Sequence, residues 1–215
     1  MEFETEEQKI EALKKWWKDN GKMVVAGLVI GGALIAGWRL YQDYRIKHSE
    51  KASALYEVVL QAAASGTDIN AQQTRVNDLL AEYANTPYAA LSALILAGQQ
   101  AKADDNIKAA QQLEWVIKNA SAVEIKTIAR LRLARLLFAS EQNDAALALV
   151  NTAYPESFTG LFEELKGDLL VAHGDKDQAR SAYDKAIQAA ENGASDFLKM
   201  KRNDLGQAKP GEPAL

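Results

Sequence analysis

The sequence has no cysteine, and among its 215 residues it has only two histidines and four prolines. Without cysteine the chain forms neither disulfides nor thiolate-bound zinc or iron–sulfur sites. His48 and His173 lie far apart in the sequence and lack the spacing of a metal site. A catalytic triad would have few candidate bases, and the glycines follow no phosphate-binding pattern. We therefore expect no catalytic residues, no metal and no cofactor, and a protein that is not an enzyme.

Net charge and composition further restrict the possible partners and the fold class of this protein. The net charge of −4 is unlike the basic balance of most nucleic-acid-binding domains, so we expect no nucleic-acid partner. The hydrophobic content of 48% fits a packed protein. No stretch alternates apolar and polar residues with a period of two, so we expect no strands and an all-α fold.

An uncharged run from Met23 to Trp38 stands between Lys22 and Arg39. As a helix it covers about 24 Å, less than the roughly 30 Å of a bilayer core. Residues 21–41, with the flanking cations extending toward the interface, reach about 31 Å. Aromatic residues also lie where membrane interfaces prefer them: Trp16, Trp17, Trp38, Tyr41 and Tyr44. A buried core helix is the alternative, but we favour a membrane span because the run is apolar on all sides.

The leader before this run argues against a cleaved signal peptide. Such peptides have a short basic leader and small residues at the cleavage site. Here the 22-residue leader carries six acids, and the run ends in Trp38-Arg39. We predict a leader at 1–20 and an uncleaved signal anchor at 21–42. Five lysines precede the run and four cations follow it, so the positive-inside rule leans only slightly toward an N-terminus in the cytoplasm.

Two pairs of small residues lie inside the anchor. Gly27 and Gly31 form one pair, and Gly32 and Ala36 form the other. Small residues four positions apart let another helix approach closely, so these are candidate contacts for a homodimer or for a partner membrane protein. The alternative is that the pairs are accidental, because glycine and alanine are common in membrane helices.

After the anchor the pattern is helix after helix. Neither proline nor glycine occurs between Trp38 and Ala64, so we expect the anchor helix to extend to about residue 65, before Gly66. Short polar connections then predict antiparallel helix pairs. The predicted helices are 71–84, 88–102, 105–118, 122–139, 143–153, 159–173, 175–191 and 194–203.

Two of these helix pairs repeat. Small and large residues recur 33 positions apart: Gly167, Leu170, Ala179, Tyr183 and Ala186 match Ala134, Leu137, Ala146, Val150 and Ala153. A weaker copy has Ala97, Ala109 and Leu113. This pattern favours a tetratricopeptide-like stack over a generic alanine-rich bundle. We predict a helical extension at 43–68, the stack at 69–205, and a disordered tail at 206–215, which has two prolines and two glycines.

Four cations lie in the predicted helix 122–139: Lys126, Arg130, Arg132 and Arg135. Helical spacing places the first two on one flank and the last two on another. One hypothesis is a basic lip in a partner-binding groove on the inner face of the stack, where it holds acidic groups. The alternative, which we favour, is that these cations pair with acids of neighbouring hairpins such as Glu163 and Glu164.

Several segments resemble YfgM-type proteins of Gram-negative bacteria. The segments are IEALKKWWKDNGK followed by VVAGLVIGGALIAGWRLY, then ARLRLARLL and LKGDLLVAHGDKDQARSAYDKA. The resemblance covers nearly the whole chain, to about residue 205. It implies a single-pass inner-membrane protein with a cytoplasmic N-terminus and a tetratricopeptide-like domain in the periplasm.

The same resemblance implies a function without catalysis. Members of this family are ancillary subunits of the SecYEG translocon, and they associate with the membrane-anchored periplasmic chaperone PpiD. We therefore expect a scaffold that links protein export to periplasmic chaperones. The alternative is a membrane-tethered regulator that sequesters a cytoplasmic response regulator or enzyme. Topology separates the two.

Overall fold

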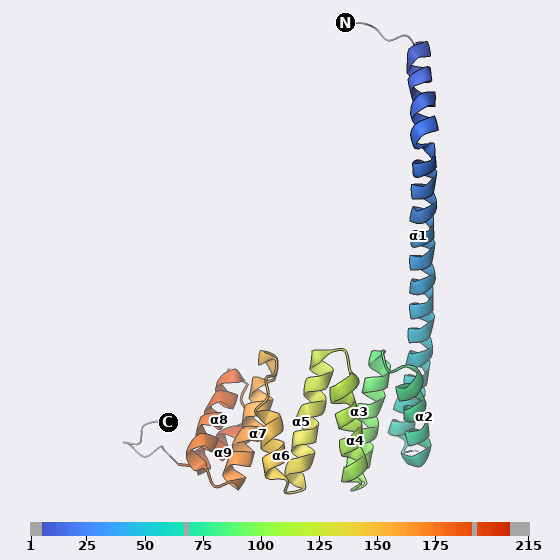
Figure 1. The fold of residues 1–215 in the computed structure, drawn as a ribbon. Coiled ribbons are helices and arrows are strands. Elements are labelled where there is room, and N and C mark those ends of the chain that lie inside the picture. The colour runs from blue at the N-terminus through green and yellow to red at the C-terminus, as the bar shows by residue number, and fades with distance from the viewer. Residues whose placement is uncertain (1–5, 67–68, 191–192, 207–215) are drawn as a thin grey trace, which may run out of the picture. The chain divides into compact units, whose positions relative to one another are not determined.

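A computed structural model describes residues 6–66, 69–190 and 193–206, and these residues form helices and no strand (Figure 1). The predicted all-α class is confirmed. The predicted disordered tail lies outside the described residues except for Gly206. The helices are α1 (Glu6–Ser65), α2 (Ile69–Glu82), α3 (Pro87–Lys102), α4 (Asn106–Asn119), α5 (Val123–Ala139), α6 (Asn143–Val150), a 3₁₀ turn (Glu156–Phe158), α7 (Thr159–Ala172), α8 (Lys176–Ala189) and α9 (Asp196–Asp204).

The chain divides into two compact units, Met1–Glu50 and Lys51–Leu215. In the first unit, the leader and the apolar run belong to the single helix α1. That helix ends at Ser65, as predicted, and Gly66 follows with a φ of 69°. This left-handed backbone is one that glycine adopts without steric cost. The boundaries between leader, anchor and extension stay predictions, because they depend on where a membrane begins and ends.

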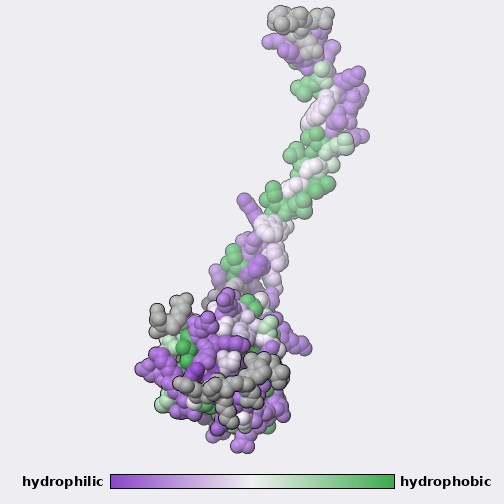
Figure 2. Space-filling view, turned by 90° about the vertical axis from the view of Figure 1, so that its left-hand side faces the viewer, coloured by the Kyte–Doolittle hydropathy of each residue, from purple (hydrophilic) through white to green (hydrophobic). Residues whose placement is uncertain are grey.

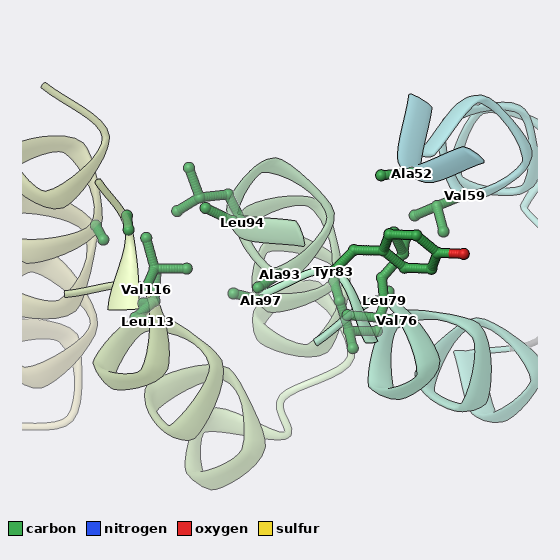
Figure 3. Close-up of a cluster of buried hydrophobic side chains, with 14 of the residues drawn as sticks. Ala52, Val59, Val76, Leu79, Tyr83, Ala93, Leu94, Ala97, Leu113 and Val116 are labelled. Atoms are coloured by element: carbon green, nitrogen blue, oxygen red, sulfur yellow. The ribbon is translucent and has the colours of Figure 1, made fainter. Parts of the chain in front are cut away.

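The second unit is a stack of antiparallel helix pairs. Each helix from α2 onward packs on the next, and α3 with α5 and α5 with α7 also make contact. The C-terminal part of α1 completes the first pair: its Ala52 and Val59 lie in one cluster with Val76, Leu79 and Tyr83 (Figure 3). The predicted tetratricopeptide-like stack is therefore confirmed.

Three helices of the stack begin at a residue whose side chain caps the helix. The side chains of Asp105, Asp175 and Ser195 accept hydrogen bonds from backbone N–H groups in the first turns of α4, α8 and α9. Such caps satisfy donors that the helix itself leaves unpaired. Most predicted helix ends lie within two residues of the observed ends.

Helix α6 is the exception, because it ends at Val150 and not at residue 153. Tyr154 precedes Pro155, and the residue before a proline is disfavoured in the helical region. The hydroxyl of Thr152 also bonds to the carbonyl of Leu149 at 2.7 Å, which closes the last turn. The segment after α6 is therefore an extended connection to α7.

Helix α5 lies between the two largest hydrophobic clusters of the stack. Its Ala129 and Leu133 belong to the cluster that extends from α1 to α5. Its Leu131 and Ala134 belong to the cluster that α5 forms with α6 and α7. Both faces of α5 are therefore buried, and its polar residues are confined to the two edges between these faces.

Candidate functional site

The surface of α1 between residues 23 and 38 is apolar and mostly exposed. Figure 2 shows it as a green band along the long helix, with purple residues on either side. The helix is long and apolar enough to cross a membrane, and none of its most apolar window is buried. Leu28 and Leu34, for example, are 71% and 70% exposed. Within its own unit this surface is not buried, and it fits a single-pass membrane protein.

The two small-residue pairs of α1 lie on different sides of the helix. At 100° per residue, the centre of the Gly27/Gly31 pair is about 140° away from the centre of the Gly32/Ala36 pair. A Cβ atom added at any of the three glycines would meet nothing within 4 Å. Both faces are therefore open, and their use by a partner helix or a second copy stays a prediction.

Arg130, one of the four predicted cations, contacts the connection between α6 and α7 and the ring of Phe162. Its guanidinium donates to the hydroxyl of Thr152 and, at 2.8 Å, to the carbonyl of Ala153. It also lies 5.9 Å from the ring centroid of Phe162 in α7. Arg130 thus fastens the connection between α6 and α7 to α5, and satisfies a carbonyl beyond the last turn of α6.

The other three predicted cations of α5 do not share the contacts of Arg130. Lys126 lies on the same edge but is only half-buried, whereas Arg132 and Arg135 are exposed on the opposite edge. Arg132 donates to the carbonyl of Leu94 in α3 at 3.3 Å. The four predicted residues therefore form two separate pairs and not one lip. Within the described residues, none of the four has a carboxylate within 4.0 Å.

The expected pairing of these cations with Glu163 and Glu164 is wrong, because both acids have other partners. Glu163 is only 8% exposed, and its Oε1 accepts a hydrogen bond of 3.0 Å from the hydroxyl of Tyr154. Its other oxygen is buried and has no hydrogen-bond partner among the residues that the structure describes. Glu164 pairs instead with Lys201 of α9, at 3.0 Å.

Lys201 belongs to a polar network that sequence reasoning missed. Its ammonium group lies 3.0 Å from Glu164 and 2.9 Å from Asp168, one turn apart on α7. Asp168 also accepts a hydrogen bond of 2.7 Å from the hydroxyl of Tyr183 in α8. Burial, then the hydrogen bond and charge of Asp168, raise the pKa of Tyr183. Burial lowers the pKa of Lys201, but its bonds to Asp168 and Glu164 outweigh this and raise it. The network fastens α9 to the last helix pair.

The residues that the structure describes give little support for a metal site or for a catalytic site built on histidine. There, no group of three or more His, Asp or Glu side chains could hold a metal ion. His173 lies 3.4 Å from Asp144, and the ring of His48 stacks on that of Tyr44. The surfaces that stand out among the described residues are an exposed apolar helix and a helical stack with charged edges.

Comparison with known proteins agrees with this class. A family model described as a tetratricopeptide repeat-like domain matches residues 14–207, which include the anchor and the stack. An ancillary SecYEG translocon subunit of Escherichia coli K12 is 31% identical over 204 residues, covering 94% of this chain and 98% of the relative.

Two further relatives that are also named ancillary SecYEG translocon subunit match most of this chain. One from Haemophilus influenzae is 30% identical, covering 93% of this chain and 97% of the relative. One from Neisseria gonorrhoeae is 27% identical, with the same coverage of 93% and 97%. The protein is thus a helical-repeat protein with one apolar N-terminal helix. It belongs to the tetratricopeptide repeat-like family that includes the YfgM-type ancillary SecYEG translocon subunits.

Proposed function

We propose that the protein is a non-enzymatic, single-pass inner-membrane scaffold that serves as an ancillary subunit of the SecYEG translocon. The observation that carries the proposal is the match to the Escherichia coli relative, which covers 98% of that protein and includes both anchor and stack. A relative that shared only the stack would say nothing of the membrane. The exposed apolar surface of α1 supports the same function, because it gives the stack an attachment beside membrane-embedded partners.

The proposed topology has the N-terminus in the cytoplasm and the stack in the periplasm. The excess of one cation on the N-terminal side of the anchor, five against four, supports this orientation only weakly. In this orientation the stack lies on the side where exported chains emerge. It can then link the translocon to periplasmic chaperones, and we propose the membrane-anchored chaperone PpiD as a partner.

Copurification tests the proposal directly. Full-length protein, extracted in mild detergent, is expected to retain SecYEG and PpiD. A matched variant retains the stack but replaces the apolar segment 23–38 with an unrelated membrane helix of equal length. It is expected to lose SecYEG if the anchor docks beside translocon helices. If the wild-type protein copurifies with neither SecYEG nor PpiD, the proposal is contradicted.

The stack supplies the proposed surface for a soluble partner. Arg132 and Arg135, exposed on one edge of α5, are the cations of the predicted groove that can receive acidic groups, because Arg130 is held by the connection after α6. Photocrosslinking from positions along 122–139 tests this assignment. Crosslinks to PpiD from positions on the Arg132 edge, and none from the Arg130 edge, would support it.

The competing function is a tether whose stack stays in the cytoplasm and sequesters a response regulator or enzyme. Alkaline phosphatase fused after Gly206 is active only in the periplasm. Activity supports the translocon subunit, and inactivity of a stable fusion supports the tether. A fusion at residue 20, before the anchor, is the control and should be inactive in the first case.

The anchor offers two open faces for the membrane partners. We propose that the Gly27/Gly31 and Gly32/Ala36 faces mediate contact with a translocon helix or homodimer formation. Replacing Gly27 and Gly31 by leucine, and separately Gly32 and Ala36, blocks one face at a time. Reduced photocrosslinking of SecYEG or of a second copy in one variant only would identify the face, and unchanged crosslinking in both would exclude these contacts.

A further inference from the structure

A shallow, open groove lies along the first part of α1, at the N-terminal end of its apolar surface. Its walls are two neighbouring rows of residues, each with helical i, i+4 spacing. One row contains Trp17, Gly21 and Val25, and the other contains Lys18, Lys22 and Ala26. The groove exists because the small residues Gly21 and Ala26 leave a hollow between larger neighbours.

The indole of Trp17 shapes this hollow. A Cβ atom built on Gly21 would lie 3.2 Å from the indole ring, and Gly21 is buried although it is part of a solitary helix segment. Trp17 therefore folds back over Gly21 and forms one end of the groove. Trp17 as a residue is still 52% exposed, so its indole can also contact a molecule that lies in the groove.

The two ends of the groove differ in polarity. Lys18 and Lys22, both exposed, lie at the end next to Trp17. At the other end lie only apolar side chains, with Val29 66% exposed and Ile30 61% exposed. No carboxylate lies within 4.0 Å of either lysine in the described part of the chain. Cations at one end and an apolar wall at the other match the chemistry of an amphipathic anion.

We infer that this groove binds an anionic phospholipid of the leaflet on the N-terminal side. The phosphate lies between the ammonium groups of Lys18 and Lys22, the glycerol region lies over Gly21, and one acyl chain follows Val25 and Val29. Lysines at a membrane interface attract anionic lipid, and tryptophan prefers the depth of the head groups. The inference rests on the proposed function only in placing α1 in a membrane.

Native mass spectrometry of the full-length protein in mild detergent tests the site. Phosphatidylglycerol and phosphatidylcholine are added in equal amounts, and the ratio of the two bound lipids is measured. The wild-type protein is expected to prefer phosphatidylglycerol. Because each interfacial lysine contributes about fivefold, the Lys18→Gln/Lys22→Gln variant should lose roughly tenfold or more of this preference.

Two further variants distinguish a specific phospholipid site from a general attraction between the lysines of the leader and anionic lipid. Lys14→Gln/Lys15→Gln removes two cations of the same leader that do not line the groove, and should reduce the ratio by a smaller factor than Lys18→Gln/Lys22→Gln does. Gly21→Leu keeps every charge but fills the hollow and displaces Trp17, so it should bind less phosphatidylglycerol.

Three results would overturn the inference: no preference in the wild-type protein, equal losses in the two lysine variants, or wild-type binding by Gly21→Leu. The assay contains no translocon. A wild-type protein that shows no lipid preference but copurifies with SecYEG would therefore contradict only the lipid site. A wild-type protein that shows the preference but does not copurify with SecYEG would contradict only the proposed function.

Discussion

Gly167 of α7 lies against the ring of Tyr183 of α8, and a Cβ atom built on Gly167 would be under 3.0 Å from three atoms of that ring. Tyr183 cannot easily move away, because it is only 3% exposed and its hydroxyl donates to Asp168 at 2.7 Å. One repeat earlier, the equivalent positions hold Ala134 and Val150, which lie in one cluster. A larger residue on one helix is therefore matched by a smaller residue on the other.

The first prediction follows from this matched packing. Gly167→Ala should lower the free energy of unfolding by about 1–3 kcal/mol, because the added methyl group overpacks the crossing of α7 and α8. The measurement is urea denaturation of the full chain in mild detergent, followed by circular dichroism. Gly98→Ala is the matched control: a Cβ atom added to this helical glycine would contact none of the described parts of the chain outside its own helical turn within 4 Å, so alanine there should stabilise by up to about 1 kcal/mol.

A second variant tests the cause of the loss. In a Tyr183→Val background the ring is absent, so Gly167→Ala should cost much less than it costs in the wild-type protein. The double variant reproduces the Ala134 and Val150 combination of the preceding repeat. An equal cost in both backgrounds would mean that the ring of Tyr183 is not what restricts Gly167.

The second prediction concerns Arg130. Arg130→Gln removes the hydrogen bond to the carbonyl of Ala153 and the contact with the ring of Phe162, so it should cost about 1 kcal/mol of stability. Arg135→Gln removes the same charge from an exposed position of α5 and should change stability by less than about 0.5 kcal/mol. Equal effects in urea denaturation would contradict the structural role assigned to Arg130.

The third prediction is a pH dependence. Burial, then the hydrogen bond and charge of Glu163, raise the pKa of Tyr154 to about 12. The folded protein thus holds the phenolic proton more tightly than the unfolded chain, where the pKa is about 10. The stabilisation is complete below pH of about 10 and is lost as the pH rises to about 12. Tyr154→Phe should make the decline of stability across this range shallower.

Glu163→Gln provides the check on the physical cause. It keeps a hydrogen-bond acceptor for Tyr154 but removes the negative charge, so the decline should lie between those of the wild-type protein and Tyr154→Phe. Thermal unfolding at a series of pH values measures all three. If Tyr154→Phe declines as steeply as the wild-type protein, Tyr154 does not contribute to the alkaline loss of stability.

The fourth prediction concerns the attachment of α9. Lys201→Gln leaves Glu164 and Asp168 one turn apart without their shared cation. Amide hydrogen exchange in α9 should then become faster, because local opening costs less. Lys199→Gln is the control, since Lys199 pairs only with Asp196 of the same helix and is exposed. Faster exchange in both variants, by the same factor, would exclude a specific role for the network.

The helices and the repeat could be predicted from the sequence because their causes are local. Short polar connections, capping residues and small residues 33 positions apart need no knowledge of distant contacts. The early end of α6 was not predicted in this way, because the connection at Tyr154-Pro155 indicated an end at residue 153 and the helix ends at Val150. The i, i+4 spacing of Trp17 and Gly21 was likewise visible in the sequence before any groove was known.

The partners of the charged residues could not be predicted in the same way. We expected Glu163 and Glu164 to pair with the cations of α5 because their helices are neighbours. Instead, Tyr154 donates a hydrogen bond to Glu163, and Lys201 forms an ion pair with Glu164. Lys201 is 33 residues or more from both of its acids in the sequence. Such pairings depend on which side chains the packed helices bring together, and no short-range pattern encodes that choice.

The position of α5 between two clusters limits how this chain can change in length during evolution. One residue inserted in the middle of α5 would turn the residues after it by about 100°, and neither cluster would keep its side chains. An insertion in the connection between α6 and α7 changes no helix register. Homologous chains should therefore differ in length at their connections, while α5 keeps a constant number of residues.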